Sequence, residues 1–364
     1  MFAQHNESND TTKIEQKERN CTVDIIRGIC ILIMIWGHVN FSNNDELNNY
    51  FSIWYHAFHM PVFYVISGYF FNCKSADEIS FIRKKAQTLL IPYFSWGFLH
   101  IAWNYLLDNS IDRLKNGTYD LFICSSIHTI PIAGALWFLA ALFWINIMYF
   151  YINKFFKSTF IVTVIAFIIS IMGIILVSKG LHLPFCLDAA LIGICFMAFG
   201  RILRIVKESK YEKYVFKMNF IVFLVLSILV NTLFFINGMV NYRSGQYAFP
   251  PVSIFNALMA SVLLWNLARF VDIKGKKYSL RIRILLSLIG ENSLIYVCLN
   301  QWFIRAISVS IVPWADSKGL WIGIIFRMIV ICMVTFCCHI AMMIILGFDR
   351  LKILIGSERN KKSN

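Results

Sequence analysis

Charged residues are scarce in this 364-residue chain, where Asp, Glu, Lys and Arg together make up 15% of the sequence. An average soluble protein carries about a quarter of charged residues, whereas 58% of this chain is hydrophobic and its mean hydropathy is +0.64. The length would allow two soluble domains, but the composition argues against them. Apolar runs close to the roughly 20-residue length that crosses a bilayer recur throughout the sequence. The composition therefore predicts one membrane-embedded bundle of helices.

Signatures of several other protein classes are also missing. The ten Cys are scattered without a CxxC or Cys/His ligand spacing, so we expect neither a metal site nor a disulfide framework. The sequence has no Gly-x-Ser-x-Gly elbow and no Walker loop, which argues against a covalent serine enzyme and an ATPase. The second half of the chain does not repeat the first half, as it does in many transporters.

We expect an all-α fold, a polytopic membrane bundle of about ten transmembrane helices. Their approximate ranges are 24–42, 56–72, 89–107, 133–152, 159–178, 184–203, 219–238, 250–269, 285–306 and 320–347. The polar stretch before the first range is longer than the n-region of a signal peptide and no small-residue cleavage site follows, so we interpret this range as a retained anchor. The expected organisation is a tail at 1–23, a membrane domain at 24–347 and a basic tail at 348–364.

The distribution of basic residues predicts the orientation of the bundle. Of the 34 Lys and Arg, 26 fall on the side of the N-terminus, six fall on the opposite side, and Arg27 and Arg327 lie within spans. Basic residues concentrate in cytosolic loops, so we expect both termini in the cytosol and the protein in the plasma membrane. Basic loops that face anionic membrane lipids account for the net charge of +14 without a nucleic-acid partner.

Arg27 and His38 lie in the first span, in the stretch VDIIRGICILIMIWGHVNF. Arg27 and His38 are eleven residues apart, which places them on one face of an α-helix with a rise of roughly 16 Å between them. One interpretation is that Arg27 snorkels to the inner surface and His38 packs near the outer interface. The other is a functional role, because ionisable groups inside a membrane are costly.

Polar residues of several other spans share the height of His38. They are His59, Asp188, Asn300, Gln301 and Arg327. A polar chamber that opens outward would explain the common depth, and Trp137 is placed either to stack on a sugar in it or to join an aromatic belt at the interface.

At the inner side, three basic residues crowd the base of the third span, namely Arg83, Lys84 and Lys85. They suit a phosphate-bearing ligand or form an ordinary basic flank. We expect His56 at the outer edge of the second span, facing lipid headgroups. Ser67 and Gly68 favour close approach of two helices rather than a nucleophile.

These residues resemble the integral-membrane acyltransferase-3 family, and most closely its fucose-4-O-acetylase-like branch. The Arg-x10-His spacing of Arg27 and His38, together with FHMPVFYVISGYFF, KKAQTLLIPYF, ALWFLAALF and IGENSLIYVCLN, matches the family's motifs in order. Two positions depart from the pattern. Gln87 and Thr88 stand where the family often has Arg, and Asn300 stands where it often has His.

The resemblance implies an enzyme that moves an acyl group, usually acetyl, from cytosolic acyl-CoA to a hydroxyl of a cell-surface glycan or its lipid-linked precursor. Acetyl-CoA would be a co-substrate, and no bound cofactor is expected. A neutral His38 would act as the general base, and Arg27 would bind the CoA phosphates or fix the first helix. Asp188 would orient the His38 ring or hold sugar hydroxyls. The rival interpretation is a glycan or lipid-linked sugar flippase without acyl chemistry.

Overall fold

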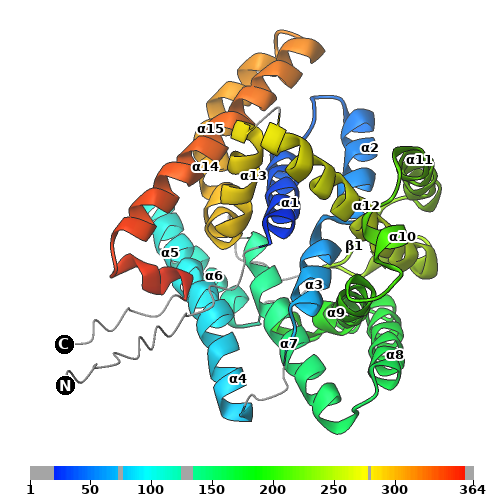
Figure 1. The fold of residues 1–364 in the computed structure, drawn as a ribbon. Helices are drawn as coiled ribbons and strands as arrows, with labels where there is room; N and C mark the ends of the chain where they lie inside the picture. The colour runs from blue at the N-terminus through cyan, green and yellow to red at the C-terminus, as the bar shows by residue number, and fades with distance from the viewer. Residues whose placement is uncertain (1–19, 73–76, 124–133, 278–279, 357–364) are drawn as a thin grey trace, which may run out of the picture.

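The computed structural model describes residues 20–72, 77–123, 134–277 and 280–356. Most of the two expected tails lies outside these residues. Within them the chain is helical apart from one two-stranded hairpin, as Figure 1 shows. The expectation of an all-α membrane bundle is therefore confirmed.

Eight helical segments are long and apolar enough to cross a membrane. The helices concerned are α1 (Cys21–Val39), α7 (Trp137–Phe155), α8 (Thr159–Ser178), α9 (Leu187–Lys207), α11 (Phe220–Asn237), α12 (Pro250–Lys277), α14 (Ser293–Asp316) and α15 (Leu320–Gly347). Short 3₁₀ turns extend two of them at their start, η2 (Gly134–Leu136) before α7 and η3 (Pro184–Cys186) before α9. Each of the eight corresponds to one of the expected spans.

The other two expected spans are built differently. The range 56–72 becomes α3 (His59–Tyr69), which is only 11 residues long because α2 (Asp45–His56) occupies the preceding segment. The range 89–107 becomes α5 (Ile91–Asp108), whose polar residues His100 and Asn104 are buried.

The remaining elements are short. A π-helical turn, η1 (Ala86–Leu90), joins α4 (Glu78–Lys85) to α5, and α6 (Ile111–Ile123) follows α5. Three further elements are α10 (Glu212–Phe216), α13 (Leu280–Glu291) and η4 (Leu351–Ile355). The range 285–306, expected as one span, is divided near Asn292 between α13 and α14.

Local sequence signals set several helix ends. Asn20 and Asn219 are N-caps whose side chains accept from the amides of Val23 and Val222, at 3.3 and 2.8 Å. Such caps satisfy backbone donors that have no partner in the first turn. Gly238, with φ +76°, ends α11 in a conformation that favours glycine.

Helix α1 lies in the interior and packs against α3, α12, α13, α14 and α15. Glycines allow α13 to approach it closely. A Cβ on Gly28 would lie 2.1 Å from the carbonyl oxygen of Leu286, and a Cβ on Gly290 would lie 1.7 Å from that of Asp24. The two backbones are in direct contact, so the helix that carries Arg27 and His38 is held firmly.

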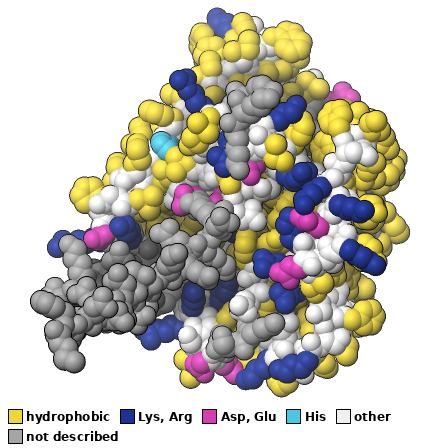
Figure 2. Space-filling view, viewed as in Figure 1, with side chains coloured by type: hydrophobic (Ala, Val, Ile, Leu, Met, Phe, Trp, Pro, Cys, Tyr) yellow, Lys and Arg dark blue, Asp and Glu magenta, His cyan; other side chains and the backbone are white. Residues whose placement is uncertain are grey.

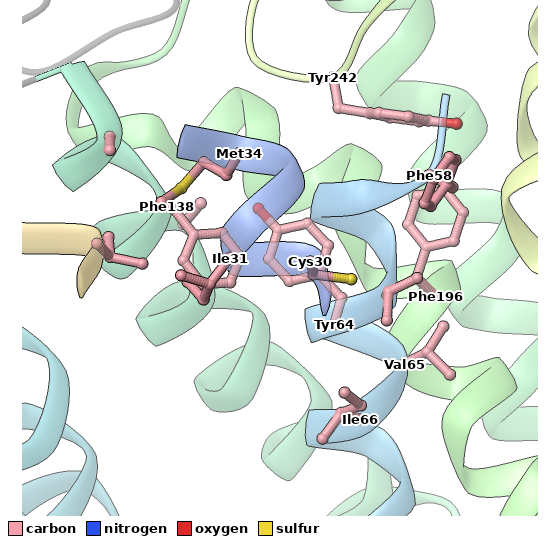
Figure 3. Packing of buried hydrophobic residues seen from close by; sticks show 14 of the residues in the cluster. Cys30, Ile31, Met34, Phe58, Tyr64, Val65, Ile66, Phe138, Phe196 and Tyr242 are labelled. Carbon is pink, nitrogen blue, oxygen red and sulfur yellow. The ribbon is translucent and has the colours of Figure 1, made fainter. Parts of the chain in front are cut away.

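Helices α3 and α9 cross in the same way. A Cβ on Gly68 would lie 1.9 Å from the carbonyl oxygen of Met197, and a Cβ on Gly200 would lie 1.9 Å from that of Val65. The predicted packing role of Gly68 is confirmed. Figure 3 shows part of the buried cluster around this crossing, to which α1 contributes Cys30, Ile31 and Met34.

The outer helices expose apolar side chains. In the most apolar stretch of α11, only 17% of the residues are buried inside the protein. In the corresponding stretch of the segment that contains α7, 72% are buried. Figure 2 shows hydrophobic side chains along much of the outline of one face, with charged side chains in its middle and right-hand part and along its lower edge. An apolar rim on a helical bundle is what a bilayer requires.

The hairpin follows α11. Its strands β1 (Val240–Asn241) and β2 (Gln246–Tyr247) pair antiparallel, with Val240 opposite Tyr247. The hydroxyl of Tyr242, in the turn, donates to the carbonyl of Ser253 at 3.0 Å. It also lies 3.4 Å from the carbonyl of Ala57, at the junction of α2 and α3. The turn is thus anchored to two other elements.

Candidate functional site

Two cavities lie along α1, one lined by Arg27 and the other by His38. The first, which we name the Arg27 cavity, has a volume of about 670 Å³. The second, the His38 cavity, has a volume of about 260 Å³. The two cavities have three lining residues in common, Phe63 of α3, Phe138 of α7 and Val297 of α14. The cavities are therefore adjacent, and these three apolar side chains, which we name the apolar constriction, lie in the wall that they share.

Cationic side chains line the Arg27 cavity. Arg27, Lys84 and Lys85 all contribute to its wall, together with Ser80 and Thr88. The guanidinium of Arg27 lies 3.5 Å from the carboxylate of Asp24, one turn earlier on α1. Lys85 is partly buried, and burial together with the like charge of Lys84 lowers its pKa to about 8. Of the three predicted donor-binding residues, Lys84 and Lys85 line the cavity, whereas Arg83 does not.

The π-helical turn η1 shapes this wall. Thr88 and Leu89 of η1 line the cavity, and π-helical turns occur frequently at functional sites. The C-terminal segment packs against the outside of this turn. A Cβ on Gly356 would lie 2.1 Å from the carbonyl oxygen of Gln87, so the two backbones are in direct contact. Gln87 is not among the lining residues.

His38 and Gln301 form the centre of the His38 cavity. The His38 side chain is exposed to it, and the amide nitrogen of Gln301 lies 3.2 Å from Nε2 and 3.3 Å from Nδ1 of the ring. Asn300 and Gln301 were both expected at this height, and Asn300 was the predicted substrate-binding residue. Asn300 itself is fully buried and its amide donates to the carbonyls of Tyr296 and Val297, at 2.8 and 2.9 Å. At this level of α14, Gln301 faces the cavity and Asn300 faces the interior of the bundle.

Two further histidines line the same cavity. Nδ1 of His59 lies 2.6 Å from the carbonyl oxygen of Tyr55, and Nδ1 of His56 lies 3.0 Å from that of Ser52. A carbonyl accepts only, so each neutral ring donates through Nδ1 and keeps its lone pair on Nε2. His59 was predicted in this chamber, whereas His56 was expected at the lipid headgroups. The break between α2 and α3 turns both rings inward.

Of the remaining predicted substrate-binding residues, Trp137 lines the His38 cavity. Asp188 and Arg327 line neither of the two cavities. Nδ1 of His182 lies 3.7 Å from a carboxylate oxygen of fully buried Asp188. Arg327 pairs with Asp316 through two contacts, one of them at 2.9 Å. Asp188 and Arg327 thus pair with residues close to them in the chain, and neither lines the cavity that contains the His38 ring.

Arg243 was not singled out from the sequence, yet the hairpin turn places it in the wall of the His38 cavity, next to Asn241 and Tyr242. The sequence gives no sign of this, because the turn lies far along the chain from His38. No group of three metal-ligating side chains is found in the described part of the chain.

Comparison with known families decides the kind of protein. The family model described as Acyltransferase domain, that of the acyltransferase-3 family, matches residues 22–343. The chain belongs to the acyltransferase-3 family. The match includes both cavities and almost all of the described helices. This acyltransferase-3 protein is therefore a multi-pass membrane acyltransferase.

One curated relative is similar over a shorter stretch. Nodulation protein NolL of Sinorhizobium fredii is 38% identical over 87 residues, which cover 21% of this acyltransferase-3 chain and 23% of NolL. The chain thus matches about a quarter of the length of that relative. No solved structure matches the chain. The expected place in the fucose-4-O-acetylase-like branch stays a prediction.

Proposed function

We propose that the protein is an O-acyltransferase that moves an acetyl group from acyl-CoA to a hydroxyl of a glycan, or of its lipid-linked precursor, on the opposite face of the membrane. One observation carries the proposal. The cationic Arg27 cavity and the histidine-lined His38 cavity share Phe63, Phe138 and Val297. An elongated donor could hold its charged end in the first cavity and its thioester near the second.

The Arg27 cavity suits the charged end of CoA. Arg27 offers a planar fork and Lys84 and Lys85 offer point charges, the two forms of side chain that bind phosphate groups. Arg27 and His38 are separated by roughly 16 Å along α1. The pantetheine arm is a flexible chain without charge, so it can cross the apolar constriction while the phosphates remain among the cations.

His38 is the proposed general base. A ring nitrogen of neutral His38 removes the proton from the attacking hydroxyl, whose oxygen forms a bond to the carbonyl carbon of the thioester. The bond between that carbon and the CoA sulfur then breaks, and the proton on His38 passes to the departing sulfur. Gln301 holds the ring at 3.2 Å, and Trp137 offers a flat apolar surface to the sugar.

The proposed orientation places the Arg27 cavity on the cytosolic side of the plasma membrane, with both termini in the cytosol. The uneven distribution of the 34 Lys and Arg over the two sides supports it. The acceptor would then be a surface polysaccharide, such as an exopolysaccharide, or its lipid-linked precursor. Acetyl-CoA would act as a co-substrate, and membrane lipids would surround the bundle.

Labelled acetyl-CoA tests the proposal. Purified protein in lipid nanodiscs, given acetyl-CoA and a lipid extract of the host membrane, should release CoA and transfer label to the extract. We expect His38→Ala to reduce turnover by about 10²–10⁴-fold. His339→Ala, which removes a half-buried histidine of α15 that lines neither cavity, serves as the control and should retain turnover.

Well-folded wild-type protein that leaves the thioester intact would contradict the proposal and favour the flippase interpretation. Normal turnover by folded His38→Ala would contradict the role of the base.

A further inference from the structure

The His38 cavity contains a cation to which the proposed general-base step assigns no role. Arg243 lines the cavity with His38, His56 and His59. Within the part of the chain that the structure describes, no acidic side chain lines this cavity and no carboxylate pairs with Arg243. Residues 124–133, which precede the lining residue Gly134, contain no Asp or Glu either.

The position of Arg243 is built rather than incidental. The side-chain oxygen of Asn241 accepts from the backbone amides of Arg243 and Ser244, at 3.0 and 3.2 Å, and so fixes the turn. Gly245, with φ +66°, ends the turn and packs against Val177. A Cβ on Gly245 would lie 2.2 Å from the side chain of Val177. With Tyr242 bonded to Ser253, the turn is held on three sides.

The guanidinium also has unused hydrogen-bonding capacity. Its Nε is buried and has no hydrogen-bond partner among the described residues. Buried donors are nearly always paired in folded proteins, and an arginine stays charged at any physiological pH. An oxyanion at this place would satisfy both the charge and the donor.

We propose that Arg243 forms an anion subsite for the acceptor, which recognises a carboxylate or a phosphoryl group next to the hydroxyl that receives the acyl group. This inference rests on the proposed acyl transfer and narrows its acceptor to an acidic sugar or a sugar phosphate. The cavity of about 260 Å³ lies just below the range of roughly 300–1,000 Å³ that is usual for drug-sized ligands. It fits one charged sugar unit rather than an oligosaccharide.

A first experiment measures the charge of the cavity and needs no acceptor. A thiol is introduced as His56→Cys, and its modification by anionic sulfonatoethyl and by cationic trimethylammonioethyl methanethiosulfonate is followed by peptide mass spectrometry. The measured quantity is the ratio of the anionic to the cationic reaction rate. We expect this ratio to be higher with Arg243 present than without it. Adding Arg243→Gln should lower this ratio about tenfold, which corresponds to about 1.4 kcal/mol, and Arg243→Lys should preserve it.

The matched control is Arg305→Gln, which removes an arginine of α14 that does not line the His38 cavity and should leave the ratio unchanged. An equal ratio with and without Arg243 would overturn the proposal, whatever the outcome for acyl transfer.

A second experiment distinguishes the sources of the anion. Acetyl transfer is compared for octyl glucuronide against octyl glucoside, and for prenyl-phosphoryl glucose against octyl glucoside. We expect at least one charged acceptor to have the lower KM, and we expect Arg243→Gln to abolish that advantage while kcat changes little. If octyl glucuronide loses its lower KM, the recognised anion is a carboxylate. If prenyl-phosphoryl glucose loses it, the anion is a phosphoryl group.

Two outcomes would overturn the subsite. One is equal KM values for charged and neutral acceptors in the wild-type protein. The other is a uniform loss of kcat for every acceptor in Arg243→Gln, which would assign Arg243 to the developing oxyanion instead. Absence of transfer to all three acceptors, with the reagent ratio intact, would count against the proposed function and not against the charge of the subsite.

Discussion

The amide nitrogen of Gln301 lies 3.2 Å from Nε2 of His38, although the two residues are 263 positions apart in the sequence. The contact joins α14 to α1 inside the smaller cavity. A neutral imidazole has one acceptor nitrogen, so the amide donates to one ring nitrogen only, and the other carries the proton. The base step needs that lone pair, so the amide rotates first, its oxygen accepts from the ring N–H, and the other ring nitrogen takes the proton of the hydroxyl.

Loss of this contact should reduce the rate of the chemical step. We expect Gln301→Leu, which keeps much of the side-chain volume, to lower kcat by about 10–100-fold, since a hydrogen bond to a charged group contributes roughly 1.5–3 kcal/mol. Gln301→Glu keeps an acceptor oxygen and should lose less. Steady-state turnover of acetyl-CoA measures both, with Trp302→Phe, whose ring lies against His100, as the control. Turnover at the wild-type rate in Gln301→Leu would exclude this role.

Arg27 should act on the donor and not on the acceptor. We expect Arg27→Gln to raise the KM for acetyl-CoA by about 10–150-fold, the range of a charge-assisted contact, with little change in the acceptor KM. Arg83→Gln is the matched control, because Arg83 belongs to the same basic run but does not line the cavity. Kinetics with each substrate varied separately give the answer. An unchanged donor KM, combined with a lower protein yield, would show that Arg27 only anchors the helix.

The affinity for the donor should depend on pH through Lys85. Because its pKa is lowered to about 8, the ammonium form predominates below pH 8 and is lost above it. We therefore expect the Kd of desulfo-CoA, which has no thiol to titrate, to rise between pH 7 and pH 9. Lys85→Arg stays charged over this range, so its Kd should remain flat. Isothermal titration calorimetry in nanodiscs measures both proteins, and an equally flat wild-type curve would remove Lys85 from the donor site.

The proposed orientation predicts which residues are accessible from outside an intact cell. Asn49, on α2, and Lys210, between α9 and α10, are both exposed. A membrane-impermeant maleimide should label Asn49→Cys in intact cells and should label Lys210→Cys only after permeabilisation. The native cysteines provide the background in the unmodified protein. Labelling of Lys210→Cys from outside would reverse the topology and place the His38 cavity in the cytosol.

The features that depend on one helix were predictable from the sequence. Arg27 and His38 lie along a single apolar helix, so helical geometry alone relates them, and each lines a cavity in the structure. The length and hydropathy of the long spans follow from the bilayer in the same way. The resemblance to the acyltransferase-3 family agrees with the match over residues 22–343.

The features that depend on helix phase or tertiary packing were not predictable. Neighbouring residues on a helix point about 100° apart, so the sequence could not decide that Gln301, rather than Asn300, faces His38. A common depth in the membrane did not bring Asp188 or Arg327 into the cavity, because each has a partner close to it in the chain, His182 and Asp316.

His56 and Arg243 were missed for a related reason. His56 enters the cavity because the chain breaks between α2 and α3, and Arg243 enters because a four-residue turn folds back over the bundle. Neither a helix break nor a short hairpin leaves a strong periodic signal in a sequence this rich in apolar residues.

The shared wall of Phe63, Phe138 and Val297 bears on the energetics of the cell. A passage that crosses the whole bilayer would short-circuit the transmembrane potential, whose value is about 2.3 kcal/mol per elementary charge at 100 mV. Three apolar side chains offer no hydration to a proton or a sodium ion, and hydrophobic constrictions of this kind close pores by excluding water. An uncharged thioester arm loses much less hydration free energy than an ion when it occupies the same constriction. Under the proposed function, the activated acyl group would pass the membrane at this point while the ion gradients of the cell stay insulated.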